Sequence, residues 1–213
     1  MQSPLVKKGD VSVSFSPVLS NFLYINAGAS YSPFEKVGIG LSTVNNNFYQ
    51  KHTGSIGFYS PLLTPHPDKK YLYKGFLTET WLHYSIGKLK EGNTDEYSIF
   101  GGFEDSYDAQ FKAYKIDVGF NYFYNYVQLT FRPKLSFVDI NKIITRTSNI
   151  APSITELINK DPYVFLESTF KLSIGTTRSG VFLGSNILFG NGSTYFERLN
   201  LFIGGRITIS DYW

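Results

Sequence analysis

The chain lacks several residue types and patterns on which common protein functions depend. It has no cysteine, and its single methionine is Met1, so disulfides, thiolate catalysis and cysteine-based zinc sites are excluded. No stretch approaches the roughly 18 consecutive apolar residues that a transmembrane helix requires. The formal net charge of +3 is too small to indicate binding to nucleic acid, so we expect no nucleic-acid partner.

The sequence also lacks the residue groupings that metal and cofactor sites require. His52, His66 and His83 are scattered along the chain, whereas a metal site needs clustered ligands. The acidic residues between 95 and 108 do not follow the Asp-x-Asp-x-Asp-Gly spacing of a calcium loop. No glycine-rich stretch lies between a predicted strand and a predicted helix, as a nucleotide site would require. We therefore expect no metal and no cofactor.

What the chain does contain is a strong two-residue alternation, rich in its 16 tyrosines and 19 phenylalanines. The segment from Tyr114 to Phe137 shows it most clearly. Ile116 and Leu129 stand on the apolar parity, and Asp117 and Arg132 stand on the polar one. Successive side chains of a strand point to opposite faces, so each strand of this predicted hairpin is apolar on one side and polar on the other.

The same alternation recurs along the whole chain and predicts an all-β protein. We expect residues 1–9 to form an extended polar lead and residues 10–213 to form one β-barrel domain of about ten strands, with eight strands as the alternative. The predicted strands are 11–16, 22–32, 37–42, 55–59, 75–86, 114–122, 127–137, 164–174, 181–189 and 199–209. Because proline ends strand pairing and favours turns, we expect a turn at 32–35 and a strand-free connection at 61–68.

Three features favour a transmembrane barrel, with antiparallel strands in up-and-down order, over a soluble all-β fold. Charged residues fall on one parity of the long strands. Short connections alternate with long ones, of which the predicted loops at 89–108 and 139–161 are the longest; we expect one helical turn at 153–158. Aromatic residues gather near strand ends, as they do at membrane interfaces; the predicted interface aromatics are Tyr122, Tyr124, Tyr126, Phe137 and Trp213. A soluble lipocalin-like binder of an apolar ligand remains the alternative.

Two stretches carry a resemblance to a known group of proteins. The last predicted strand, 199–209, alternates and is followed by Trp213, and it resembles the closing strand of bacterial outer-membrane barrels. The residues 4–13 and 27–33 resemble the opening of small outer-membrane barrel lipoproteins of the Bacteroidota. The resemblance implies export to the bacterial outer membrane and, in many relatives, a lipid-bearing N-terminal cysteine, which this sequence lacks. Residues 1–4 have no basic and apolar leader pattern, so we expect a mature form.

The charged residues on the polar parity predict a filled lumen. Both signs occur on neighbouring strands, and a barrel of about ten strands is narrow enough for side chains to fill. Buried charges must be paired to be tolerated, so we expect a ladder of ion pairs inside the barrel. Its predicted members are Glu79, Lys115, Asp117, Arg132, Lys134, Glu167, Lys171, Arg198 and Arg206.

These residues support two hypotheses about function. The first is an outer-membrane barrel without catalytic activity, in a structural, accessory or docking role, whose long loops contact protein partners in a larger outer-membrane assembly and whose exterior contacts lipid. The second is an outer-membrane lipid hydrolase in which His83 is the general base and Glu79 or Asp117 orients it. The sequence offers no serine motif of fixed spacing for such an enzyme.

Overall fold

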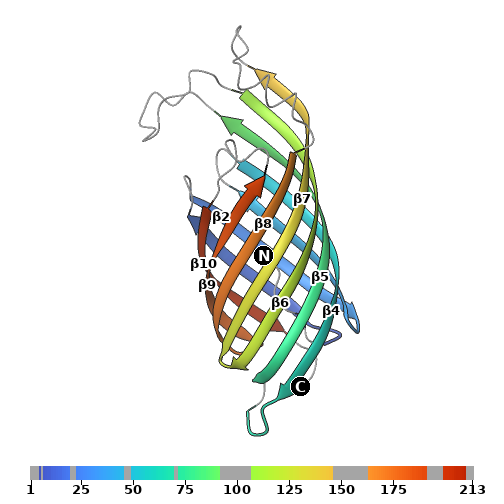
Figure 1. The fold of residues 1–213 in the computed structure, drawn as a ribbon, viewed down its shortest axis with the longest axis vertical. Helices are drawn as coiled ribbons and strands as arrows, with labels where there is room; N and C mark the ends of the chain where they lie inside the picture. Colours follow the sequence, from blue (N-terminus) through green and yellow to red (C-terminus); the bar gives the residue numbers. More distant parts are fainter. Residues whose placement is uncertain are drawn as a thin grey trace.

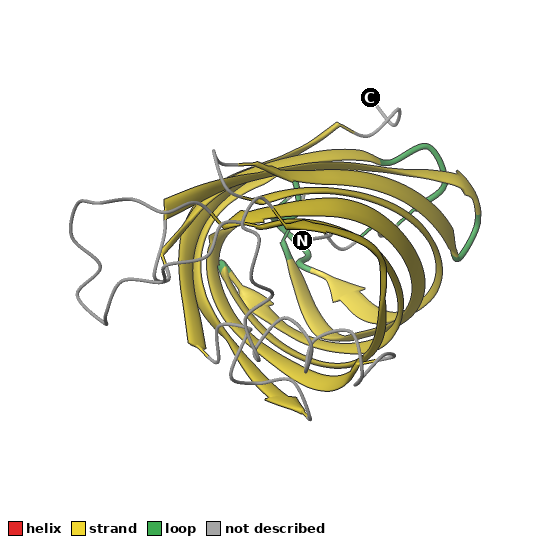
Figure 2. Ribbon diagram, turned by 90° about the horizontal axis from the view of Figure 1, so that it is seen from above, coloured by secondary structure: helices red, strands yellow, loops and turns green. Residues whose placement is uncertain are grey.

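The computed structural model describes residues 5, 7–19, 23–45, 49–69, 72–91, 107–145, 163–190 and 199–209. Ten antiparallel strands follow one another around a closed barrel, and β1 pairs with β10 to complete it (Figures 1 and 2). The prediction of a single up-and-down barrel of about ten strands is confirmed. The strands are β1 (Val11–Leu19), β2 (Leu23–Phe34), β3 (Val37–Asn45), β4 (Tyr49–Pro65), β5 (Tyr73–Glu91), β6 (Tyr107–Asn125), β7 (Val127–Thr145), β8 (Tyr163–Gly175), β9 (Ser179–Gly190) and β10 (Leu199–Ile209).

The predictions based on proline were wrong at two places. Strand β4 continues through the stretch from Pro61 to Pro65, which pairs with β5, whereas its pairing with β3 ends at Phe58. A proline in this part of β4 therefore leaves no hydrogen bond to β3 unmade, as on an edge strand. Strand β2 likewise runs past Pro33, where the register with β3 shifts at a bulge, and bulges accommodate proline.

The strands β5, β6 and β7 are also longer than the alternation predicted, at 19 residues each. Their pairing continues to the Glu91–Tyr107 and Tyr107–Thr145 pairs. The predicted loops at 89–108 and 139–161 therefore begin too early, and the first of them also ends too late. Backbone pairing needs no apolar alternation, which explains why the pattern under-predicted these strands. In Figure 1, β7 reaches the top of the barrel. The helical turn predicted at 153–158 lies outside the described residues.

The connections differ between the two ends of the barrel. At one end, which we call the short-turn end, the strands are joined by residues 35–36, 66–72, 126 and 176–178. Lys36 and Asn125 adopt positive φ angles of 64° and 53° there, the left-handed conformation of tight turns. The two longest connections, 92–106 and 146–162, belong to the opposite end, together with the short connections 20–22 and 46–48. The longest connections are therefore gathered at one end, as predicted, but that end also has short ones.

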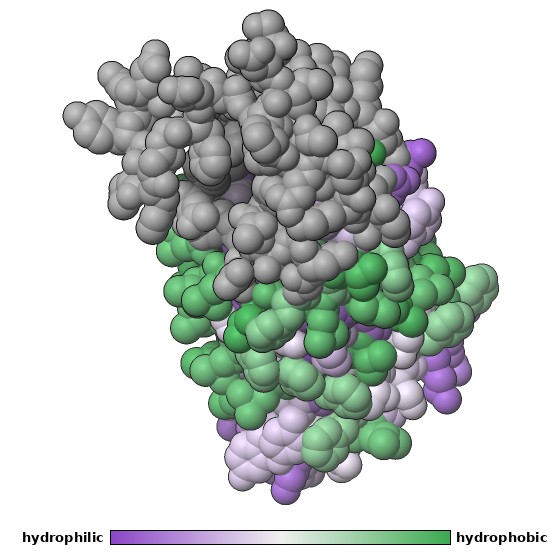
Figure 3. All heavy atoms as spheres, turned by 45° about the horizontal axis from the view of Figure 1, so that its top comes forward, coloured by the Kyte–Doolittle hydropathy of each residue, from purple (hydrophilic) through white to green (hydrophobic). Residues whose placement is uncertain are grey.

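The outer face of the barrel wall is apolar and the inner face is polar. Phe15, Leu82 and Ile203 are exposed by 53%, 51% and 55%, and all three point outwards. On the same strands Ser14 and Glu79 point inwards and are buried. Hydrophobic side chains form a broad band around the face shown in Figure 3. Among the described residues, none forms a helix long and apolar enough to cross a bilayer.

A small apolar core lies inside the barrel. Trp81 is completely buried and packs with Leu77, Phe123, Tyr59 and Leu5. The presence of Leu5 in this core means that the chain before β1 turns into the lumen.

A turn before β1 directs the lead inwards. Gly9 adopts a φ of 86°, and its amide donates to the Ser32 carbonyl over 2.8 Å. The Asp10 carboxylate accepts a 2.8 Å bond from the Lys7 amide. The described part of the predicted lead is therefore tied to β2 at Gly9 and placed in the apolar core at Leu5.

Candidate functional site

The charged side chains of the lumen come from β5 to β8, whose register brings their inward-facing residues into adjoining rows. Trp81 pairs with Asp117, Asp117 with Lys134, and Lys134 with Glu167. Each residue shares the inward parity of its strand, as the alternation predicted. The structure thus brings acids and bases from four neighbouring strands onto one part of the inner wall.

Glu79 and Arg132 form the most deeply buried ion pair. Arg132 Nη2 lies 2.7 Å from Glu79 Oε1, although β6 separates their strands. Gly119 makes this contact feasible, since it stands opposite Glu79 and a Cβ there would lie 3.1 Å from Arg132 Nε and 3.3 Å from Glu79 Oε1. The Trp81 indole and the Asn121 amide each donate a 2.7 Å bond to the same carboxylate, so Glu79 is held by three donors.

Asp117 links this pair to His83. Its Oδ2 atom lies 2.7 Å from His83 Nε2 and 3.8 Å from Arg132 Nη1. The Asp117 side chain is 1% exposed and that of His83 is 11% exposed. The histidine therefore hydrogen-bonds with Asp117, whereas Glu79 accepts hydrogen bonds from Arg132, Trp81 and Asn121.

Glu167 forms a second centre of charge pairing. Lys115 Nζ lies 2.6 Å from its Oε1 atom, and Lys134 Nζ lies 3.7 Å from its Oε2 atom. The Ser136 hydroxyl donates a further 2.8 Å bond to Oε1. Six of the nine predicted lumen residues are thereby joined in two groups, around Arg132 and around Glu167.

An uncharged network extends from these pairs, and the sequence reasoning missed it. The Thr130 hydroxyl and the Gln128 amide both donate to Asn121 Oδ1, over 2.8 and 3.1 Å. Arg206 Nη1 in turn donates to Gln128 Oε1 over 3.1 Å. The alternation does place Gln128 and Thr130 on the inward parity of Arg132, so the sequence carries a signal for this network. The predicted ladder contained charged residues alone.

Of the three remaining predicted lumen residues, two are described, and neither Lys171 nor Arg206 forms an ion pair with a described carboxylate. Lys171 places its Nζ 5.4 Å from the centre of the Phe182 ring. Arg206 bonds to Gln128 and, through Nη2, to the Thr176 carbonyl over 3.1 Å. Arg198 lies outside the described residues.

The predicted interface aromatics that are described face outwards. Tyr124, Tyr126 and Phe137 are exposed by 51%, 47% and 42%, and the Tyr122 ring packs against Phe76 with 4.9 Å between ring centres. The tyrosines lie near the short-turn end, while Phe137 lies further along β7. Trp213 lies outside the described residues.

His83 and Asp117 lie in the lumen as a candidate base and its orienting acid. The pairing partner of His83 on β4 is Ser55, whose hydroxyl donates to the Gly40 carbonyl over 3.1 Å. Within the described part of the chain, no three histidine, aspartate or glutamate residues are grouped as a metal site requires.

Together these observations define a closed ten-stranded barrel with an apolar exterior and a charge-filled lumen. No family model matches the chain, and no curated protein matches it. Among solved structures it is similar to the translocator domain of the autotransporter NalP from Neisseria meningitidis. The identity is 12%, the match covers 93% of this chain and 87% of that chain, and the TM-score is 0.33. The assignment to a closed barrel rests on the strand register described above.

Proposed function

We propose that the protein is an integral barrel of the bacterial outer membrane whose plugged lumen supports a structural or docking role. The apolar exterior is the observation behind the membrane location. Leu23, Leu41, Leu62 and Val181 are each exposed by more than 60%, and such a surface in water would be an aggregation or binding hazard. A soluble binder of apolar ligands would need an apolar cavity, whereas the described interior is occupied by charged groups, hydroxyls and the packed core around Trp81.

The filled lumen is the single observation that carries the proposed role. Trp81, Glu79 and Asp117 are each at most 2% exposed, and they project into the lumen from adjoining strands. The ion pairs around Arg132 and Glu167 join β5, β6, β7 and β8 side chain to side chain. A conducting pore needs a continuous aqueous path, and these packed groups occupy the place where it would run.

The connections 92–106 and 146–162 are the surface that we propose contacts a partner. They follow β5 and β7, the strands that extend furthest, and loops on a rigid scaffold commonly carry recognition. We propose a protein partner in the outer membrane, with membrane lipid around the barrel. A lipid-bearing N-terminus and an origin in the Bacteroidota, which the resemblance described above implies, stay predictions.

Planar-bilayer recording of the refolded protein tests this role. We expect no stable open channel, while the unboiled protein migrates faster than the boiled protein on a cold SDS gel, as a folded barrel does. The gel serves as the control that folded barrel was added. A stable open pore in the wild-type protein would overturn the plugged lumen, and detergent-independent solubility would overturn the membrane location.

The 2.7 Å contact between His83 and Asp117 keeps lipid hydrolysis as a second candidate function. It is tested by comparing the phospholipid and lipid A species of cells that express wild-type protein or His83→Ala. We expect the same products in both, because the Ser55 hydroxyl opposite His83 donates to the Gly40 carbonyl and the imidazole ring faces the lumen, away from lipid. A product that disappears with His83→Ala and persists with the distant His52→Ala would establish the enzyme.

A further inference from the structure

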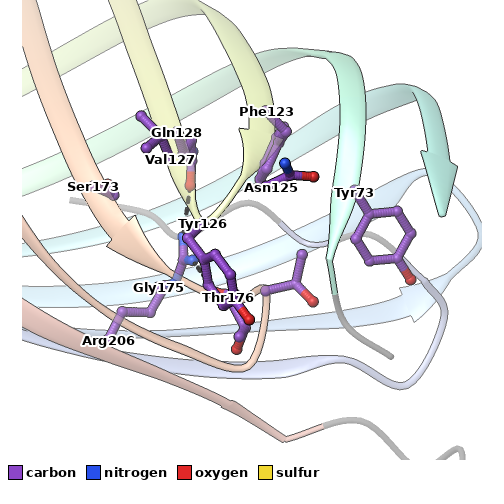
Figure 4. A pocket seen from close by; sticks show the side chains of 11 residues that line it. Tyr73, Phe123, Asn125, Tyr126, Val127, Gln128, Ser173, Gly175, Thr176 and Arg206 are labelled. Atoms are coloured by element: carbon purple, nitrogen blue, oxygen red, sulfur yellow. Dashed lines mark hydrogen bonds between the residues drawn. The ribbon is translucent and has the colours of Figure 1, made fainter. Parts of the chain in front are cut away.

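A recess opens between the turns of β6–β7 and β8–β9, at the short-turn end of the barrel. Its lining includes Gln128, Ser173, Thr176 and Arg206 (Figure 4), and we call it the mouth recess. In Figure 4 the Arg206 side chain reaches from β10 toward Gln128, to which it is hydrogen-bonded. The lining also includes the apolar and aromatic side chains of Tyr73, Phe123, Tyr126 and Val127, so polar groups meet apolar ones there.

The charges of the lumen do not balance near this recess. The three described carboxylates that β5, β6 and β8 place on the inner wall, those of Glu79, Asp117 and Glu167, are all engaged. Their cationic partners are Arg132, Lys115 and Lys134. One cation is thus present for each carboxylate before Lys171 and Arg206 are considered.

Lys171 and Arg206 are two further buried basic side chains of the inner wall. They are only 7% and 6% exposed, and neither forms an ion pair with a carboxylate in the described part of the chain. Buried charges are ordinarily paired or bound to an ion, so this pair points to an anion that comes from outside the chain.

Two unpartnered polar atoms lie on residues that line the same recess. The Ser173 hydroxyl and Arg206 Nε are buried and have no hydrogen-bond partner among the described residues. Ser173 is 5% exposed and stands one inward-facing position along β8 from Lys171. A hydroxyl and a guanidinium N–H are both donors, and donors of this kind form strong, charge-assisted bonds with oxyanions.

We propose that the mouth recess binds a small oxyanion, a phosphate or a carboxylate, through Arg206 and Ser173, with Lys171 supplying the second positive charge. The site faces the end of the barrel with the short turns, so its ligand enters from that side of the membrane. It is independent of the proposed docking role, because the long connections belong to the opposite end.

Isothermal titration of the detergent-refolded barrel tests the site, with inorganic phosphate as the probe, acetate in a parallel arm, and sodium chloride at matched ionic strength as the blank. We expect saturable binding of one anion per barrel. The phosphate and acetate arms show which oxyanion the recess prefers. Absence of saturable binding in both arms for the wild-type protein would overturn the proposal.

Variants of the recess locate the binding. Arg206→Gln is expected to weaken binding by at least about tenfold, since it removes a charged donor, and Lys171→Gln is expected to weaken it several-fold. The control is Lys74→Gln, whose side chain lies over the Tyr124 ring near the same end but outside the recess, and it should bind as the wild type does.

Ser173→Ala tests the site even if Arg206→Gln and Lys171→Gln, which each remove a buried cation, fail to fold. The Ser173 hydroxyl has no partner in the described structure, so its removal should leave the barrel folded, with heat-modifiable migration intact. The affinity for the anion should fall several-fold. Wild-type affinity in Ser173→Ala, or in folded Arg206→Gln, would place the anion elsewhere.

Discussion

Two opposite parts of the inner wall line one lumen with different kinds of side chain. Strands β5 to β8 present large and charged groups, among them Trp81, Arg132 and Glu167. Strands β1 to β3 present mainly small ones, and the buried residues there are Ser12, Ser14, Ser16, Ser30, Ser32, Gly38 and Gly40. Because the strands follow one another around the barrel, β6 and β7 face β1 and β2 across the lumen.

The difference shows how a barrel of this size is filled. The small side of the wall leaves space, and the large side supplies the groups that occupy it and their hydrogen-bond partners. The boundary between the two is close-packed: a side chain at Gly38 or Gly57 would overlap the Trp81 indole. Stability should therefore depend unequally on the two sides, and substitutions of matched chemistry can measure the inequality.

The largest loss is expected for Glu79→Gln, in the centre of the charged side. It leaves the Arg132 guanidinium, itself 6% exposed, with Asp117 at 3.8 Å as its remaining carboxylate. Removing one partner of a buried ion pair costs about 3 to 5 kcal/mol. The free energy of unfolding in urea, measured in lipid vesicles, should fall by that amount.

Glu35→Gln is the matched control for this substitution. Glu35 is exposed in the turn between β2 and β3, and a surface change of this type should shift the free energy of unfolding by less than about 0.5 kcal/mol. Equal effects of the two variants would mean that the lumen is hydrated enough to solvate Arg132. The prediction that stability depends more on the charged side of the wall would then be wrong.

A smaller loss is expected where the two sides meet, for Gly57→Ala on β4. Its methyl group would press on the Trp81 ring, and overpacking of this kind costs about 1 to 3 kcal/mol. Gly54→Ala, three residues away on the same strand, is the control, since nothing lies within 4 Å of a Cβ there. It should be neutral or slightly stabilising. Similar unfolding free energies for both variants would show that Trp81 can move aside.

Much of this fold could be predicted from the alternation of residues, because successive side chains of a barrel strand point alternately to the lumen and to the exterior. Strand β10 was predicted with its observed bounds, Leu199–Ile209. The ends of β4, β5, β6 and β7 could not be predicted, because they are held by backbone pairing with a neighbouring strand and not by their own pattern. The entry of Leu5 into the lumen depends on a tertiary contact with Trp81 that has no local signal.

The alternation predicted which residues line the lumen, but it did not predict which of them contact one another. Glu79 reaches Arg132 across β6 only because Gly119 lacks a side chain between them, and His83 bonds with Asp117 because their strands are in that register. A one-residue shift would have changed every partner. The excess charge of Lys171 and Arg206 emerges only after the partners of the three carboxylates are known.

The smallest difference in the free energy of unfolding is expected between the alanine variants of two serines. Ser136 and Ser16 are equally buried, at 0% exposure, and lie on opposite sides of the wall. Ser136 on β7 donates to Glu167 over 2.8 Å, whereas the Ser16 hydroxyl on β1 has no partner among the described residues. Ser136→Ala should lower the free energy of unfolding by about 1 to 2 kcal/mol, since a bond to a charged acceptor is lost. Ser16→Ala should change it by less than about 0.5 kcal/mol, or raise it, because an unsatisfied hydroxyl is removed. If both variants lost the same amount in the same urea series, the serines of β1 would be bonded as firmly as those of β7, and the small side would be a polar network in its own right.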